Sequence, residues 1–120
     1  MQKKSILSRI KHIKVKTRVE SIDIYRLGVF NNTMFELVEL RKGKNYPPHI
    51  HKNSKADLYI IFGEGKIILN GKGKNYKAGD KFYVAKKIAH GFKVKTSTLF
   101  LSIQKPPIIN KKNKIDVEYK

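Results

Sequence analysis

The chain has 120 residues, with 27 lysines and arginines against 9 aspartates and glutamates, so its formal net charge at pH 7 is +18. A chain of this length forms one domain and buries about two thirds of the surface that its unfolded form exposes. The absence of cysteine excludes thiolate metal sites, cysteine nucleophiles and disulfide scaffolds. No apolar run is long enough for a membrane span or a signal peptide, so we expect a cytoplasmic protein.

The positive charge is compatible with nucleic-acid binding, but the kind of basic residue argues against specific recognition. Lysine accounts for 23 of the 27 basic residues, whereas recognition of phosphates and bases favours the planar guanidinium of arginine. The lysines are scattered, and the chain has no helix-turn-helix, zinc-finger or aromatic RNA-binding motif. We therefore expect weak attraction to polyanions at low salt and no specific nucleic-acid partner.

Short alternating or β-branched runs, separated by turn residues, predict an all-β fold. Residues 5–17 suit either a short helix or a strand. Asn70-Gly71 predicts a tight hairpin, because both residues tolerate positive φ. Many short strands with turns about every ten residues are typical of a sandwich or a barrel. In chain order, the predicted strands are 19–27, 33–40, 58–62, 66–69, 81–84, 92–95 and 98–103.

The pair His49-Ile50-His51 is the most informative chemical feature of the chain. Residues two apart in an extended strand point to the same side, about 7 Å apart, so both imidazoles can bind one ion. Pro47 and Pro48, which come just before, cannot lie inside a helix and push the residue before each of them into an extended conformation. The pair is therefore expected on an extended strand.

Two segments resemble the paired signature motifs of the cupin superfamily. In the first, Gly43 is followed by five residues, His49, one residue and His51, and the motif ends at Gly63. In the second, Gly79 precedes His90.

This resemblance covers residues 35–104, and it implies a cupin jelly-roll barrel of two antiparallel sheets with little helix. We interpret residues 1–18 as a basic N-terminal arm that reaches a second subunit, and residues 19–107 as the cupin barrel domain. Residues 108–120 are expected to form a polar, mobile tail, with Pro106-Pro107 ending the ordered sheet.

The chain departs from the family motif where a glutamate is usual, because Ala56 stands there. The nearest acidic residue is Asp57, one place later. Strand alternation points Asp57 to the opposite face, unless a single-residue bulge turns it inward. Asp57 is thus a candidate fourth ligand. In the second motif Ala85, Lys87 and Val94 replace the usual proline, glycine and asparagine.

The resemblance implies that His49, His51 and His90 are metal ligands. Neutral imidazole suits the divalent transition metals Zn, Fe, Ni, Mn and Cu, and three protein ligands leave positions open for water or substrate. His90 could instead be a hydrogen-bonded core histidine. We expect a Lewis-acid enzyme, an isomerase or lyase, that acts on a small polar or anionic substrate such as a sugar or carboxylic acid. The alternatives are a non-catalytic ligand-binding or sensing protein, a non-haem dioxygenase, and a metal-free domain that lost its site with the change to Ala56.

The strand phase of the histidine pair also predicts the pocket and an interface. Tyr59 and Ile61 would point outward, where they would support a homodimer. If the phase continues across the barrel, the residues that line an apolar pocket are Leu58, Ile60, Phe62, Phe82, Phe92 and Gln104. Each of these pocket residues, taken singly, could equally be an ordinary part of the hydrophobic core.

Overall fold

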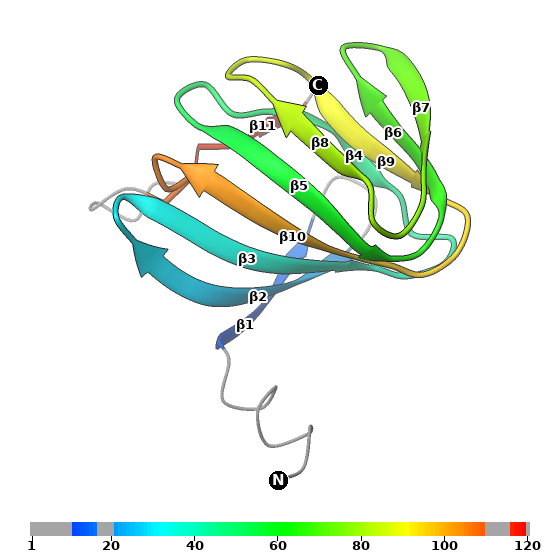
Figure 1. Cartoon of the computed structure of the whole chain (residues 1–120), viewed down its shortest axis with the longest axis horizontal. Coiled ribbons are helices and arrows are strands. Elements are labelled where there is room, and N and C mark those ends of the chain that lie inside the picture. Colours follow the sequence, from blue (N-terminus) through cyan, green and yellow to red (C-terminus); the bar gives the residue numbers. More distant parts are fainter. Residues whose placement is uncertain (1–10, 17–20, 110–115, 120) are drawn as a thin grey trace, which may run out of the picture.

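In the computed structural model of the protein, residues 11–16, 21–109 and 116–119 are described. Within these ranges the chain forms two antiparallel β-sheets that face each other (Figure 1). The described residues include no helix that could cross a membrane. The predicted all-β architecture of two antiparallel sheets with little helix is confirmed.

The larger sheet has six strands and the smaller has five. In spatial order the six strands are β1 (Lys11–Lys16), β2 (Ser21–Phe30), β3 (Thr33–Leu40), β10 (Thr98–Lys105), β5 (Lys55–Phe62) and β8 (Lys81–Val84). The five strands of the smaller sheet are β11 (Glu118–Tyr119), β4 (Tyr46–Ile50), β9 (His90–Val94), β6 (Gly65–Leu69) and β7 (Lys72–Tyr76).

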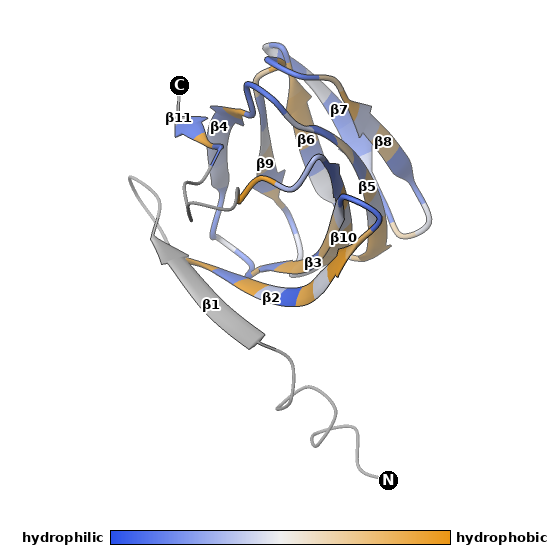
Figure 2. Cartoon of the chain, turned by 90° about the vertical axis from the view of Figure 1, so that its left-hand side faces the viewer, coloured by the Kyte–Doolittle hydropathy of each residue, from blue (hydrophilic) through white to orange (hydrophobic). Residues whose placement is uncertain are grey.

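The core lies between the two sheets because buried residues alternate along the strands of the larger one. In β3 every second side chain from Met34 to Leu40 is buried, and in β10 the same holds from Thr98 to Gln104. Ile67 and Phe92 meet them from the smaller sheet and are almost fully buried. Each such apolar side chain stabilises the fold by about 1.5–3 kcal/mol. Figure 2 shows the two sheets curving toward each other around this space.

Tight turns hold neighbouring strands in register. Asn70 and Gly71 have φ values of 50° and 82° and join β6 to β7, which confirms the hairpin predicted from this dipeptide. Asn31 and Asn32, at 52° and 56°, join β2 to β3 in the same way.

The two ends of the chain add strands to the barrel. β1 pairs with β2, so the part of the N-terminal arm that the structure describes is a strand. As predicted, β10 ends just before Pro106-Pro107, but ordered pairing continues beyond the two prolines, because β11 pairs with β4 in the smaller sheet. Ile108 is buried, and its carbonyl accepts a hydrogen bond of 2.6 Å from the amide of Asp116. Apolar burial and backbone pairing thus outweigh the polar composition of this segment.

Candidate metal centre

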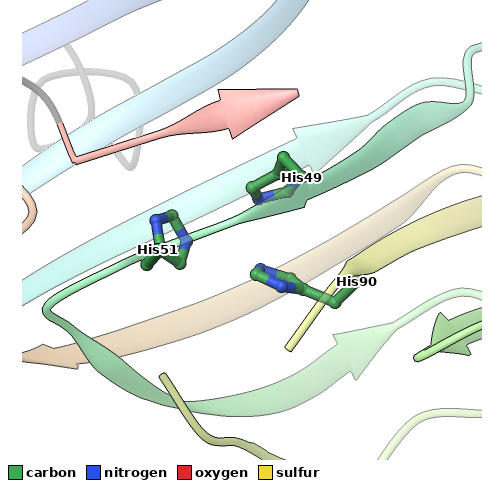
Figure 3. Close-up of side chains that lie close together, drawn as sticks. All are labelled: His49, His51 and His90. Carbon is green, nitrogen blue, oxygen red and sulfur yellow. The ribbon is translucent and has the colours of Figure 1, made fainter. Parts of the chain in front are cut away.

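The smaller sheet brings His49, His51 and His90 together (Figure 3). His49 lies near the end of β4, His51 follows that strand directly, and His90 begins β9 opposite His49. The ring centroids of His49 and His90 are 4.1 Å apart, and those of His51 lie 5.1 Å from His49 and 5.0 Å from His90. One ring nitrogen from each histidine lies within 4.8 Å of the others.

Backbone carbonyl groups orient all three imidazole rings. The Nδ1 atoms of His49 and His90 lie 3.0 Å from the carbonyl oxygens of Pro47 and Ile88, and that of His51 lies 2.6 Å from the carbonyl oxygen of Asp116. A carbonyl oxygen can only accept, so each Nδ1 carries the hydrogen and donates it. The lone pair is then on Nε2, which is the arrangement that second-shell partners impose on metal-ligating histidines.

Burial keeps the three imidazoles neutral. Burial lowers the pKa of His90 to about 4. Burial also lowers the pKa of His49 well below its usual 6.5, and the neighbouring His90 lowers the pKa of His49 further. Burial also lowers the pKa of His51, although the carbonyl and carboxylate of Asp116 oppose the shift. At neutral pH no proton has to be displaced from Nε2 before a metal can bind.

This donor set fits a divalent transition metal. Two nitrogen ligands of one ion, each at about 2.1 Å, lie at most about 4.2 Å apart, so small rotations of the rings suffice to close the group on an ion. Nitrogen donors of this kind suit Zn, Fe, Ni, Mn and Cu.

The structure does not bring Asp57, the candidate fourth ligand, to the histidines. Asp57 lies on the outer face of β5, where Lys81 Nζ is 3.9 Å from its Oδ1. The bulge needed to turn it inward is absent, because the pairing of β5 with β8 is continuous from Ala56 to Tyr59. Ala56 instead is buried and faces the histidines across the cavity described next.

A cavity of about 310 Å³ lies between the histidines and the inner face of the larger sheet. Of the six predicted pocket residues, Leu58, Phe92 and Gln104 line it. Ile60 lies in the core instead, and Phe82 is half-buried against that core. A second hollow of about 730 Å³, lined by lysines such as Lys66 and Lys93, is more open and contains none of the three histidines.

The expectation that Phe62 lines the pocket is wrong, since its side chain is 45% exposed. The reason is a one-residue bulge near the end of β5. Phe100 pairs with Ile60, whereas the preceding Leu99 pairs with Phe62, so Ile61 is the extra residue. Such a bulge shifts the alternation by one place, and Ile61 and Phe62 both remain exposed.

A polar wall faces the histidines, and the sequence reasoning identified only one of its members, Gln104. The wall consists of Arg26, Glu36, Ser102 and Gln104 from β2, β3 and β10. Arg26 Nε donates to Glu36 Oε2 at 2.9 Å, and Gln104 Nε2 donates to Glu36 Oε1 at 3.0 Å and to Ser102 Oγ at 2.8 Å. Arg26, Glu36 and Ser102 are direct neighbours across the three strands.

A signal for Glu36 was present in the sequence. In Met34-Phe35-Glu36-Leu37-Val38 the glutamate shares its strand face with Met34 and Val38, which the alternation places in the core. A carboxylate on the strand face that points into the core is expected to have buried hydrogen-bonding or charged partners.

Two other residues support the histidines. The ring of Tyr46 stacks on that of His49 with centroids 4.2 Å apart. The carboxylate of Asp116 accepts hydrogen bonds from the amides of Lys52, Asn53 and Ser54 at 2.8, 2.8 and 3.2 Å. Asp116 therefore holds the loop that follows His51 as well as the His51 ring. No sequence motif pointed to Asp116.

A two-sheet jelly roll that encloses a buried three-histidine group defines a class of small β-barrel proteins. The family model described as "Cupin domain" matches residues 36–103, which is more than half of the chain. The chain therefore belongs to the cupin family, as its motifs predicted. No curated protein matches its sequence.

Solved structures show the same fold. A protein from Thermotoga maritima, described as a predicted oxalate decarboxylase, superposes with a TM-score of 0.73 and 24% identity, over 83% of this chain and 96% of that one. A putative sugar phosphate isomerase from Acidithiobacillus ferrooxidans superposes with a TM-score of 0.68 and 18% identity, over 87% of this chain and 72% of that one. The nucleoside dehydratase Pac13, from Streptomyces, superposes with a TM-score of 0.69 and 16% identity, over 91% of this chain and 84% of that one. At these identities the likeness concerns the fold alone.

Proposed function

We propose that the protein is a metal-dependent enzyme of the isomerase or lyase type, which acts on a small polar or anionic molecule inside the barrel. The observation that carries this proposal is the convergence of three buried, neutral imidazoles on one point beside a cavity of about 310 Å³. His49, His51 and His90 would hold the ion. The chemistry that such an ion supplies is Lewis-acid polarisation of a substrate oxygen.

The other cavity residues would bind and enclose the substrate. Apolar side chains such as Leu58, Phe92 and Phe100 exclude water from the space beside the histidines, which strengthens polar interactions made there. The polar wall around Glu36 offers hydrogen-bonding groups on the opposite side. A cavity of 310 Å³ has the volume of about ten water molecules, so it suits a substrate of metabolite size.

The reactions named for two similar structures agree with this proposal without defining it. One is described as a putative sugar phosphate isomerase and another as a nucleoside dehydratase. Both names describe rearrangement or elimination on small hydroxylated molecules, which is the chemical class that the cavity could admit here.

Metal analysis of protein purified without a histidine tag is the first test. We expect about one divalent transition-metal ion per chain, and we expect His90→Ala to lose most of it because one of three ligands is removed. His12→Ala is the matched control, since the backbone of His12 lies in β1, an edge strand of the larger sheet, whereas β4 and β9 belong to the smaller sheet. A purified protein that takes up no ion under metal-buffered conditions would refute the metal-dependent function.

A substrate screen on the metal-loaded protein separates an enzyme from a binding protein. Isomerisation or elimination of a sugar or hydroxy acid supports the proposal. Binding without turnover would point to the sensing alternative, and consumption of dioxygen would point to a dioxygenase.

We further propose that the protein is a cytoplasmic homodimer that associates through the outer face of the larger sheet. Every large apolar side chain that is strongly exposed among the described residues belongs to a strand of this sheet, and none to the smaller one. Exposed apolar patches of this kind mark interaction surfaces. The residues concerned are Leu27, Phe30, Ile61, Phe62 and Tyr83, whereas the exposed Val29 pairs with the inward-facing Met34 and lies on the inner side of β2.

A further inference from the structure

Gln104 has a buried hydrogen-bonding atom with no partner. The side chain lines the cavity and is 3% exposed. Both N–H bonds of its amide are used, one by Glu36 Oε1 and the other by Ser102 Oγ. Its Oε1 atom, in contrast, accepts no hydrogen bond within the described part of the chain. A buried acceptor left without a donor costs about 1–3 kcal/mol, so its persistence beside a cavity requires an explanation.

The amide cannot be turned round to remove this defect. Rotation by 180° would place the Gln104 oxygen against Glu36 Oε1, which accepts and cannot donate while the carboxylate is ionised. The carboxylate therefore fixes the orientation of the amide. Within the described part of the chain the oxygen of Gln104 is thus left without a donor, in a side chain that lines the cavity.

The neighbouring groups define what that donor can be. Ser102 accepts from Gln104, so its own hydroxyl hydrogen remains available for donation. Each oxygen of Glu36 accepts one bond from Arg26 or Gln104 and can accept another. Acceptors and a hydroxyl donor therefore alternate along this wall. A hydroxyl group of a ligand, which both donates and accepts, complements such a surface.

The groups next to Gln104 disfavour an anionic group at that position. Glu36 is 1% exposed, and Arg26 lies against it with Nε 2.9 Å from Oε2, so the pair is neutral as a whole. A ligand carboxylate placed against Gln104 would face an acceptor and a second carboxylate, which is a repulsive arrangement. An anionic or chelating group is better accommodated at the histidine side of the cavity.

We infer that Gln104, oriented by Glu36, is a specificity-determining residue that binds a hydroxyl group of the substrate, and that the substrate is a polyhydroxylated small molecule with a metal-chelating end. This inference rests on the proposed function, because it concerns the same cavity. It narrows the substrate class from small polar or anionic molecules to sugar-like polyhydroxy compounds, and it disfavours dicarboxylates.

Matched pairs of ligands test the inference. Glycerate and lactate, erythronate and 2-hydroxybutanoate, and gluconate and 2-hydroxyhexanoate share a carboxylate and a 2-hydroxyl group, and differ in their further hydroxyls. Kd is measured for each on the zinc-loaded protein by calorimetric or NMR titration. In at least one pair the polyhydroxy acid should bind about two- to tenfold more tightly, as expected for one additional neutral hydrogen bond.

Substitutions then assign the preference to the residue. Gln104→Met removes the oxygen at similar volume and should bring the affinity ratio of that pair to about one. Leu58→Met is the matched control, a volume-conserving change on the apolar wall that should leave the ratio unchanged. Equal binding within every pair, no binding of any ligand, or a ratio that survives Gln104→Met would overturn the inference.

A second variant keeps the test decisive if Gln104→Met does not fold. Glu36→Gln removes the charge but keeps two hydrogen-bonding groups. It should raise the affinity for the dicarboxylate 2-hydroxyglutarate about tenfold, because it removes a like-charge contact and leaves Arg26 without its carboxylate partner. An unchanged affinity for this ligand would also contradict the inference.

Metal content, measured in the same samples, separates a failure of the proposed metal-dependent function from a failure of the role inferred for Gln104. A protein that binds zinc without any hydroxyl preference refutes only the role of Gln104. A protein that binds no metal refutes the proposed function and the metal-chelating end of the substrate, and the same titrations on the metal-free protein then decide the hydroxyl preference alone.

Discussion

Ala56 is the residue that most affects how the three histidines could hold an ion. It is buried on the inner face of β5, with Gln104 as its neighbour on β10 and Val84 on β8. Its methyl group leaves space in the cavity where the family motif has a carboxylate. A three-histidine site keeps the full charge of the ion, so it favours anionic or chelating ligands more than a site with an added glutamate.

We predict that Ala56→Glu raises the metal affinity and suppresses turnover. The added carboxylate supplies charge and a further ligand, while it occupies an open position and reduces the Lewis acidity of the ion. Competition with a metal buffer measures the affinity. Asp57→Asn, on the outer face of the same strand, should change neither property. A loss of metal in Asp57→Asn would show that this carboxylate does reach the site.

The pKa shifts of the histidines predict a pH-dependent stability of the metal-free protein. His90 has a pKa of about 4 when folded and about 6.5 when unfolded, so between these values the unfolded chain binds more protons. The free energy of unfolding should therefore decrease as the pH falls from 6.5 towards 4, by about 3 kcal/mol from His90 alone. His49 and His51 shift in the same direction.

Urea unfolding at a series of pH values measures this dependence. His90→Asn should reduce the slope, because one of the three buried imidazoles is removed. A stability that stays constant over this range would show that the imidazoles are not desolvated as their burial implies.

At the scale of elements, the segment around β11 completes the site. The backbone carbonyl of Asp116 orients His51, and the carboxylate of Asp116 accepts hydrogen bonds from three consecutive amides of the loop after His51. The next residue, Val117, lines the cavity. The three histidines belong to the smaller sheet and to one loop, so their geometry depends on this segment as well as on β4 and β9.

We predict that Asp116→Asn weakens metal binding about tenfold, in the range typical of changes in second-shell partners. The neutral amide makes weaker hydrogen bonds to the loop and loosens His51. Metal-buffer titration measures the change. Glu118→Gln is the matched control, because its ion pair with Lys52 is exposed and should contribute little. Equal losses in both variants would indicate a general effect on β11 rather than on His51.

The elements differ in how far their role could be predicted from sequence. Most strands and the histidine group follow from local signals, namely alternation, prolines, turn residues and motif spacing. The polar strand β7 and the short strand β11 were not among the predicted strands. The outward turn of Phe62 could not be predicted, because the bulge at Ile61 depends on the pairing of β5 with β10. The wall around Glu36 was also missed, since its members come from three strands that only the sheet places side by side. Asp116 contacts a loop more than 60 residues earlier, and no local pattern reports such a contact.

At the scale of the whole molecule, charge and apolar surface oppose each other. The chain carries a net charge of +18, so two copies repel each other at low salt. The apolar side chains on the larger sheet act against this repulsion by about 25 cal/mol for each Å² that they bury. Dimerisation should therefore strengthen as salt screens the charge.

We predict a dimer at micromolar concentration, and we predict that Ile61→Lys weakens it by adding charge to the apolar face. Ile61 is 47% exposed, so the change should cost little folding stability. Sedimentation at two salt concentrations measures both effects. Ile68→Lys, on the outer face of β6 in the other sheet, is the control. A chain that stays monomeric at high salt would refute the interface.

The hydrogen bond between His51 and Asp116 also has a consequence for synthesis. The two residues are 65 positions apart, so at about 5–20 residues per second the ribosome needs roughly 3–13 s after making His51 before it reaches its partner. During that interval the imidazole of His51 has no carbonyl to fix its tautomer, whereas His49 has already been made and His90 is made before Asp116. A nascent chain that lacks Asp116 therefore cannot orient His51 as the folded protein does, and metal capture is expected to follow folding rather than to guide it.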